Sequence, residues 1–379
     1  MKSALDGIRV VEFSSFTAGP LCGALLAQLG AQVVKVEPPD GDQLRRLSTQ
    51  IDGVSYLFHI NNGGKRSVVA DLKQAEGRAR ALDLAADADV VLENFAPGTL
   101  GRRGLDYASV RARNPGVVYC SVNGFGASGP LKDERAYDVV IQGLSGIVSL
   151  SGHDREHPVK VGPSIVDMMG AVMGASAIIA ALRYREQSGE GQSIELAMYD
   201  VAAWLTAGAW PQLIAGRVPR AAGNRGTNGD WQDLFATVDG HVVIAAPRRS
   251  QRDALRTLCV AGARATEDEE ELRSRVADWC CRQSTSEVVA RCQEQGVVAA
   301  PVLGLEDVAT HQQFRERGIL VEMQSASGRS VPIFGSPLRM SRTPGVAQGF
   351  AEAVGASTES VLADVRARQA RRRDTHTIA

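Results

Sequence analysis

Cysteine and histidine are scarce and scattered in this chain of 379 residues, which holds six of each. The cysteines form no C-x-x-C pair, and no histidine lies at zinc-ligand spacing from them. The histidines form no H-E-x-x-H pattern either. The sequence therefore predicts core thiols, no structural disulfide and no metal site. The cysteines are Cys22, Cys120, Cys259, Cys280, Cys281 and Cys292.

The chain also lacks an excess of charge of one sign. Its 42 lysine and arginine residues balance 43 aspartate and glutamate residues, for a formal net charge of −1. A chain of this kind has no overall field that would hold nucleic acid or an anionic membrane, so neither partner is expected. The five arginines within residues 366–373 form a basic tail that is typical of a frayed, solvated C-terminus.

No apolar run is long enough to predict a membrane span. Residues 168–182 are apolar or glycine apart from Ser176, but the run is shorter than the roughly 18 to 20 residues that cross a bilayer. It predicts a buried helix. The chain enters a strand-like segment at residues 8–13, which leaves no room for a signal peptide, so a cytoplasmic location is expected.

The first third of the chain alternates short runs rich in valine and isoleucine with longer amphipathic segments. This alternation is typical of parallel strands joined by crossover helices, and it predicts a doubly wound α/β domain. Ligands bind beyond the carboxyl ends of such strands, here after Phe13, Glu37, Leu92 and Val122. The expected strands are 8–13, 32–37, 89–92 and 117–122, and the expected helices are 21–29, 74–86 and 107–113.

The later part of the chain predicts a second, smaller domain. Helices are expected at 139–150, 164–184 and 201–214, with a strand at 191–196 between the last two. After a glycine-rich loop at 223–229, the Asp239-Gly240 pair predicts a hairpin of strands 234–238 and 241–246. Helices then dominate residues 252–295. We expect a large domain over residues 1–215 and a small α+β domain over residues 225–330.

One glycine-rich segment resembles the motif of a dinucleotide-binding site. Residues 124–129 match G-x-G-x-x-G after a strand, but Pro130 follows where a helix should begin, and no acidic residue lies about 20 residues further on. The segment therefore predicts a turn at the sheet edge. No Walker sequence is present.

Cationic, aromatic and amide side chains follow several of the predicted strands. Arginine binds phosphate with two hydrogen bonds, an aromatic ring can stack on a base, and asparagine can donate to a carbonyl. Together they are compatible with a phosphorylated, partly apolar ligand, and equally with scattered surface cations. The residues are Lys65, Arg66, Lys73, Asn94, Phe95, Arg102, Arg103 and Arg135.

Asp167 lies near the start of the longest apolar helix and has two interpretations. Ser164 after Pro163 is a preferred N-cap, and Asp167 three residues later completes the pattern of a capping box. A carboxylate at a helix N-terminus is also expected to stay ionised at neutral pH, as a nucleophile must. The local pattern does not separate the cap from the nucleophile.

A set of short motifs resembles, by its joint order and spacing, the family III CoA-transferases, which include formyl-CoA and carnitine CoA-transferases and the related α-methylacyl-CoA racemases. The resemblance runs from about Leu5 to Pro344. Its motifs are Ala18-Gly19-Pro20, Lys35-Val36-Glu37, Gly64-Lys65-Arg66-Ser67, Glu93-Asn94-Phe95, Gly124-Phe125-Gly126 with Gly129-Pro130, Tyr137-Asp138, and Gly189 with Gly191-Gln192.

The resemblance implies a reaction and a site. In the family, the aspartate at the position of Asp167 attacks an acyl-CoA to form an aspartyl anhydride and then an aspartyl-CoA thioester, which passes CoA to a free carboxylic acid. It implies CoA as a substrate and no tightly bound cofactor. By the same matching, the residues that contact CoA or frame the site are Thr17, Ala18, Lys73, Asn94, Phe95, Arg102, Arg135 and Tyr137.

The resemblance also implies an architecture and leaves alternatives. Family members are interlaced homodimers in which a Rossmann-like large domain also takes the end of the chain, here residues 331–379. An α-methylacyl-CoA racemase on the same fold and a non-catalytic nucleotide-binding module are the alternatives. Racemases place a histidine base where this chain has Tyr137, which favours CoA transfer. The acyl donor and the acceptor acid stay open.

Overall fold

The computed structural model describes residues 3–226, 230–259 and 267–377. They form two compact units. Unit 1 comprises Met1–Ile141, Gly162–Ala202 and Arg317–Ala379, and unit 2 comprises Gln142–Val161 and Ala203–Glu316. The domain bounds that we expected, 1–215 with 331–379 and 225–330, stay a prediction. The end of the predicted loop 223–229 lies outside the described residues.

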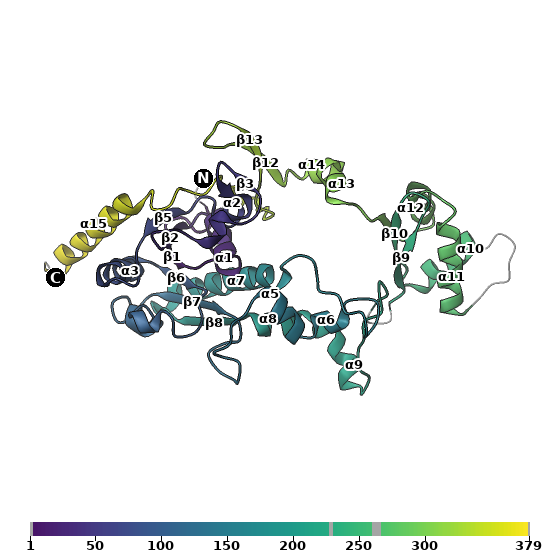
Figure 1. Cartoon of the computed structure of the whole chain (residues 1–379), viewed down its shortest axis with the longest axis horizontal. Coiled ribbons are helices and arrows are strands. Elements are labelled where there is room, and N and C mark those ends of the chain that lie inside the picture. Colours follow the sequence, from purple (N-terminus) through teal and green to yellow (C-terminus); the bar gives the residue numbers. More distant parts are fainter. Residues whose placement is uncertain (1–2, 227–229, 260–266, 378–379) are drawn as a thin grey trace. The chain divides into compact units, whose positions relative to one another are not determined.

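A parallel sheet of six strands forms the centre of unit 1, with the strand order β5-β2-β1-β6-β7-β8 (Figure 1). All neighbouring strands pair in parallel, so the predicted parallel α/β sheet is confirmed. The chain runs from β1 to β2 and β5 on one side of β1 and then crosses to β6 on the other side, and this reversal of direction opens a crevice at the carboxyl ends of β1 and β6. The strands are β1 (Arg9–Phe13), β2 (Gln32–Glu37), β5 (Arg66–Val69), β6 (Val90–Glu93), β7 (Val118–Asn123) and β8 (Ser193–Ala197).

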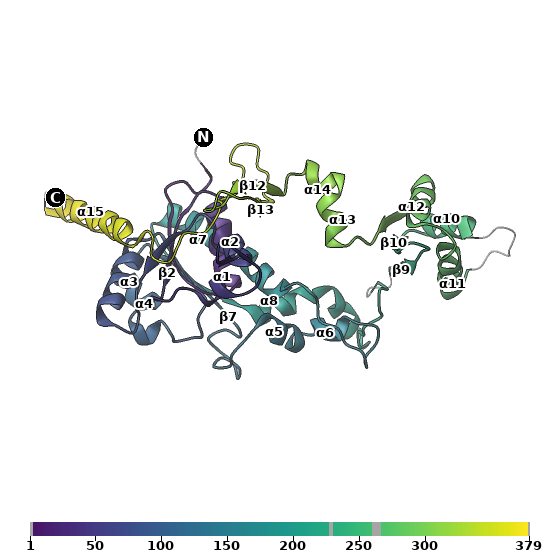
Figure 2. The ribbon, with the colours of Figure 1, turned by 45° about the horizontal axis from the view of Figure 1, so that its top comes forward.

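Helices cover both faces of this sheet (Figure 2). On one face, α3 (Ala75–Asp87), α4 (Tyr107–Arg111) and α15 (Thr358–Thr377) share an apolar core with the strands. On the other face, α1 (Ala18–Gln28) packs against α7 (Ile165–Ser188). Alternate strand residues point to opposite faces, so each strand contributes to both cores.

Glycine allows α1, α7 and β1 to approach closely. A Cβ atom on Gly174 of α7 would lie 3.3 Å from Sγ of Cys22 on α1, and one on Gly23 of α1 would lie 2.0 Å from Oε2 of Glu12 on β1. Among the described helices, α7 alone is long and apolar enough to cross a membrane by length and composition. Its close packing on α1 is that of a core helix in a folded domain.

The remaining elements of unit 1 are short. They are η1 (Gln43–Arg46), η2 (Gly101–Arg103), α2 (Tyr56–Asn62), the hairpin β3 (Gln50–Ile51) and β4 (Val54–Ser55), and the hairpin β12 (Leu320–Gln324) and β13 (Ser330–Phe334). Two helices begin in unit 1 and end in unit 2, namely α5 (Asp138–Leu144) and α8 (Met198–Leu205).

Unit 2 contains an antiparallel sheet with the order β11-β10-β9 and three helices around one apolar core. The predicted hairpin is confirmed as the pair β9 and β10. The elements are α6 (Ile147–Leu150), η3 (Ala207–Ala209), α9 (Trp210–Ile214), β9 (Gln232–Ala236), β10 (His241–Ala245), α10 (Arg249–Cys259), α11 (Glu269–Cys280), α12 (Thr285–Glu294), β11 (Val298–Pro301), α13 (Leu305–Thr310) and α14 (Gln312–Glu316).

Three local predictions were wrong. The helix expected at 201–214 is divided among α8, η3 and α9. The helix expected at 139–150 is divided between α5 and α6, because Gly146 has a φ of 92° that no regular helix accommodates. The arginine-rich segment that we expected to be a frayed tail is part of α15, where Nε of Arg368 donates a 2.7 Å hydrogen bond to Asp87.

A network of buried charges joins β1, β2 and β5. Glu12 is fully buried, and its carboxylate accepts from Nζ of Lys35 at 3.1 Å and from Nζ of Lys65 at 2.7 Å. Lys65 also donates to the carbonyl of Pro20 at the start of α1. Lys35 also forms an ion pair with Asp42 at 3.1 Å. The motif lysines of the sequence therefore bind together the strands that carry the crevice.

A second buried ion pair fastens the end of the chain to the sheet. The carboxylate of Glu37 accepts from Arg45 at 2.6 and 2.8 Å and from the hydroxyl of Ser67 at 2.6 Å. Arg45 stacks over the ring of Phe58 and donates to the carbonyl of Glu352 at 2.9 Å. One guanidinium thus holds β2, α2 and the segment that leads to α15.

Arg45→Ala should destabilise the protein, because it leaves the buried carboxylate of Glu37 without its cation. We expect a loss of about 3–5 kcal/mol in the free energy of unfolding, measured by urea denaturation. The matched control is the exposed Arg46→Ala, which should change it by no more than about 0.5 kcal/mol. Equal effects from the two variants would contradict a structural role for the pair.

Candidate active site

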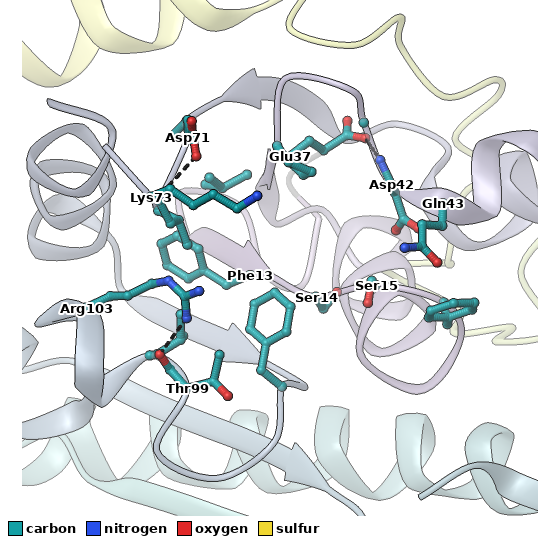
Figure 3. A pocket seen from close by; sticks show the side chains of 18 residues that line it. Phe13, Ser14, Ser15, Glu37, Asp42, Gln43, Asp71, Lys73, Thr99 and Arg103 are labelled. Carbon is teal, nitrogen blue, oxygen red and sulfur yellow. Dashed lines mark hydrogen bonds between the residues drawn. The ribbon is translucent and has the colours of Figure 1, made fainter. Parts of the chain in front are cut away.

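A cavity of about 290 Å³ opens at the carboxyl edge of the parallel sheet in unit 1 (Figure 3). Its walls come from the ends of β1, β2, β5 and β6 and from the segments that follow them. This is the place that the strand order predicts for a ligand. The lining residues are 13–16, 36–38, 41–43, 70–73, 95, 99–100 and 103.

Cations and aromatic rings share this cavity. Lys73 and Arg103 reach into it from the same side, and Glu37 and Asp42 lie opposite them (Figure 3). Nη1 of Arg103 donates to the carbonyl oxygen of Thr99 at 2.9 Å, which fixes the direction of the guanidinium. With Phe95 in the lining, the cavity offers two positive charges and an apolar surface to a ligand that carries phosphate and a ring.

The other residues predicted to contact CoA do not all lie at this cavity. Thr17 and Ala18 directly follow the lining residue Phe16 and begin α1. Arg102 is exposed on η2 and outside the lining, whereas its neighbour Arg103 lines the cavity. Arg135 and Tyr137 are exposed in the segment before α5, also outside the lining. Their contacts with CoA stay predictions.

Asn94 holds the loop between β1 and α1. Its side-chain oxygen accepts from the backbone N–H of Ser15 at 2.9 Å, and its side-chain nitrogen donates to the carbonyl of Ser15 at 2.8 Å. The next residue, Phe16, has a φ of 63°, and its carbonyl accepts from the buried side chain of Asn61 at 3.2 Å. Non-glycine residues with this φ are uncommon, so these amides maintain a strained wall of the cavity.

Asp167 lies at the same edge of the sheet as the cavity. Helix α7 ends just before β8, which runs parallel to the other strands. A helix that returns to the start of a parallel strand runs antiparallel to it, so the N-terminus of α7 lies toward the carboxyl edge. The fold therefore brings Asp167 to the edge where β1, β2 and β6 end.

The capping-box interpretation of Asp167 is wrong. Ser164 is the N-cap residue of α7 but makes no side-chain cap. Oδ2 of Asp138, the first residue of α5, instead accepts from the backbone N–H of Val166 at 2.8 Å and of Asp167 at 3.1 Å. Asp138 satisfies the helix N-terminus from 29 residues away in the sequence, a contact that local spacing does not reveal.

The expectation that Asp167 stays fully ionised at neutral pH also needs correction. Burial, and after it the charge of Asp138, raises the pKa of Asp167 to about 7. Near neutral pH, the carboxylate and the neutral acid are therefore both populated. Because basicity and nucleophilicity rise together, the ionised form is a stronger nucleophile than an ordinary aspartate.

The buried and half-buried thiols offer no comparable nucleophile. Burial raises the pKa of Cys120, Cys259 and Cys280 to about 12 and that of Cys292 to about 11, and it raises that of Cys22 well above its usual value. Neutral thiols react poorly at neutral pH. The prediction of core thiols is wrong for Cys281, which is exposed, and holds only partly for the half-buried Cys259.

Asp167→Asn should stabilise the folded protein increasingly as the pH rises. A carboxyl whose pKa is raised on folding destabilises the native state once the pH exceeds its unfolded pKa, and this cost grows until the folded pKa near 7 is passed. We expect a gain of about 1–4 kcal/mol at pH 8 and a smaller gain at pH 5, measured by urea denaturation.

Asp106→Asn is the control for this measurement. Its hydrogen bonds to Ser109 lower the pKa of Asp106, so this substitution should bring no gain as the pH rises. A pH-independent effect of Asp167→Asn would contradict a raised pKa.

Comparison with known proteins identifies the family. The chain matches the CoA-transferase family III over residues 5–358. It is 36% identical over 366 residues to the succinate–glutarate CoA-transferase of Agrobacterium fabrum, covering 90% of this chain and 91% of that protein. It is 35% identical over 364 residues to the succinyl-CoA:mesaconate CoA-transferase of Haloarcula hispanica, with the same coverage of 90% and 91%.

A solved structure supports the same assignment. The crystal structure of a CaiB/BaiF family protein from Brucella suis superposes with a TM-score of 0.86 at 33% identity, covering 96% of this chain and 100% of that one. The match extends over both units and not over the sheet alone. The resemblance carried by the short sequence motifs is thus confirmed, and the chain belongs to CoA-transferase family III and is a CoA-transferase.

Proposed function

We propose that the protein moves CoA from an acyl-CoA thioester to a free carboxylic acid through covalent intermediates on Asp167. The observation that carries this proposal is the partly buried carboxyl of Asp167 at the N-terminus of α7, with its pKa raised to about 7. Burial also raises the pKa of Glu93 at the end of β6, but that carboxylate is buried and accepts from the backbone N–H of Phe95 at 2.8 Å, whereas Asp167 is only partly buried. A covalent route divides a difficult exchange into easier steps.

The steps balance as four acyl transfers. The Asp167 carboxylate attacks the thioester carbonyl, which forms an aspartyl acyl anhydride and expels CoA thiolate. The thiolate attacks the aspartyl carbonyl of the anhydride, which forms an aspartyl-CoA thioester and releases the donor acid as its carboxylate. The acceptor carboxylate attacks this thioester to form a second anhydride and thiolate. The thiolate then attacks the acceptor's acyl carbonyl, which gives the new acyl-CoA and restores Asp167.

The cavity at the sheet edge suits the nucleotide end of CoA. We propose that Lys73 and Arg103 bind its phosphates and that Phe95 contacts the adenine ring, because the two cations reach into the cavity from one side and Phe95 lines the same cavity. Arg103 takes the place in this proposal that sequence matching gave to Arg102. CoA acts here as a substrate, with no tightly bound cofactor, and a cytoplasmic location stays a prediction.

The names of the relatives support a class of acids. Two of them are named for succinate or succinyl-CoA together with a second dicarboxylic acid, glutarate or mesaconate. We propose short dicarboxylic acids as donor and acceptor, with succinyl-CoA as the first donor to test. A racemase has no comparable support, because the exposed Tyr137 stands where the family's racemases have a histidine base.

Hydroxylamine should trap the intermediate on Asp167. With succinyl-CoA and no acceptor acid, hydroxylamine attacks either the anhydride or the aspartyl-CoA thioester and leaves a hydroxamate, whereas a resting carboxylate does not react. Peptide mass spectrometry should find the label on Asp167 only after acyl-CoA is added. Asp167→Ala should abolish the label and lower exchange on the order of 10³-fold or more.

The internal control for trapping is Asp200, an exposed carboxylate in the first turn of α8 that should stay unlabelled. An acyl group found on a cysteine when hydroxylamine is left out, or exchange by Asp167→Ala at the wild-type rate, would refute aspartyl catalysis. Absence of label with every acyl-CoA of a panel would refute it too, since the covalent route requires an activated aspartyl carbonyl with some donor.

We propose further that the chain forms a homodimer that covers an apolar face beside Asp167. Tyr137 is 64% exposed, Met168 50% and Val172 48%, and Val139 and Val140 are exposed as well. These side chains belong to α5, α7 and the residue before α5. An exposed apolar patch beside a catalytic carboxyl suits an interface with a second copy, which would also exclude water from the site.

Sedimentation equilibrium should give twice the mass of the chain. Val172→Glu should weaken the dimer by placing a charge in the interface, whereas Val238→Glu, at the exposed turn between β9 and β10, should leave the mass unchanged. A single-chain mass for the wild type at micromolar concentration would contradict the proposal.

A further inference from the structure

Helix α7 receives its cap from another helix. Its own N-cap residue, Ser164, makes no side-chain hydrogen bond to the first turn. Oδ2 of Asp138 accepts from the N–H of Val166 at 2.8 Å and from the N–H of Asp167 at 3.1 Å. Asp138 is also the first residue of α5. One carboxylate therefore joins the starts of two helices.

The second of these hydrogen bonds comes from Asp167 itself. A carboxylate bound to the backbone N–H of a residue is held within a few ångströms of that residue's side chain. Both residues are only partly exposed, so water screens their charges less than at an open surface. The fold thus places a second acidic group beside the carboxyl that the reaction needs.

We propose that Asp138 is a positioning residue that fixes Asp167 at the start of α7 and, through its negative charge, destabilises the ionised carboxylate until it is acylated. The inference rests on the proposed function of Asp167. When Asp167 becomes an anhydride or a thioester, its side chain is neutral and the repulsion from Asp138 disappears. The same contact therefore orients the nucleophile and raises its free energy in the resting enzyme only.

Electrostatic causes support this assignment. Among the described residues, the charge that raises the pKa of Asp167 comes from Asp138, and burial contributes the larger part. A cap alone would not need this charge. Serine or asparagine can accept the same N–H bonds, and Ser164 is already at the N-cap position without doing so.

Two substitutions separate the charge from the cap. Asp138→Asn keeps a side-chain oxygen that accepts from Val166 and Asp167 but removes the charge, whereas Asp138→Ala removes both. The control is Asp268→Asn in unit 2, because Asp268 likewise accepts from two backbone N–H groups at the start of α11. Each variant is assayed as the full chain for CoA exchange between succinyl-CoA and a dicarboxylate across pH 5 to 9.

The pH profile is the readout that a structural cap would not move. In Asp138→Asn, the acidic limb of the kcat/KM profile should move to lower pH by about one unit, because a like charge beside Asp167 has been removed. At pH 8, Asp167 is ionised in both the wild type and Asp138→Asn. The rate of CoA exchange by Asp138→Asn should be severalfold lower there, because its Asp167 carboxylate is less basic. Asp138→Ala should show the same shift with a lower melting temperature, and Asp268→Asn should show no shift.

An activity-independent titration separates failure of this inference from failure of the proposed function. Protein labelled with ¹³C at the aspartate carboxyl gives a signal for Asp167 that is identified by its loss in Asp167→Asn. Its titration midpoint should be lower in Asp138→Asn than in the wild type, whatever the substrate. An unchanged midpoint in a folded Asp138→Asn protein would overturn the inference. A shifted midpoint without CoA exchange for any substrate pair would overturn the proposed function and leave the electrostatic contact standing.

Discussion

The buried carboxylate of Glu12 is the interaction on which the rest of unit 1 depends. It binds Lys35 of β2 and Lys65, which precedes β5, and Lys65 also binds the first turn of α1. Removing charges from water is costly, so such a cluster persists only where each member has its partners. Burial lowers the pKa of Lys65 to about 8 against the opposing effect of Glu12. The cluster fixes three strands and the start of α1, and so fixes the walls of the cavity.

Close packing of α1 on β1 and of α7 on α1 connects this cluster to the helix that holds Asp167. Gly23 of α1 lies against Glu12, and Gly174 of α7 lies against Cys22 of α1, so larger residues at either glycine would separate these elements. The sheet edge that carries the cavity and Asp167 is therefore assembled from contacts that begin at β1. The loop before α1 is held in the same way, with Asn94 and Asn61 maintaining the strained backbone at Phe16. Hydrogen bonds of this kind can stabilise a backbone conformation, here the positive φ of Phe16, that is unfavourable for the residue itself.

The sequence predicted the elements around the sheet better than the contacts between them. Apolar periodicity located β1, β2, β6, β7 and β8 but missed β5 and the short hairpin of β3 and β4. Strand β1 also holds Glu12, whose partners are 23 and 53 residues away and leave no local pattern. The spacing of Ser164 and Asp167 matched a capping box, although Asp138 provides the cap. Arg102 and Arg103 are adjacent in sequence, and only the turn of η2 decides which of them faces the cavity. Helix α15 was not predicted, because the arginines of residues 366–373 indicated a solvated tail. Val361, Leu362 and Val365 of this helix are nevertheless buried.

The proposed electrostatics of Asp167 also bear on specificity. Repulsion from Asp138 is relieved equally when Asp167 carries an anhydride of the donor, an anhydride of the acceptor or the CoA thioester, because all three are neutral at the aspartyl carbonyl. The contact therefore accelerates acylation without distinguishing one acid from another. Discrimination between acids must come from groups that touch the acyl chain itself, since specificity is a difference in contacts between competing substrates. Relatives named for different acid pairs can then share a nucleophile and its supporting carboxylate while differing around the acyl group.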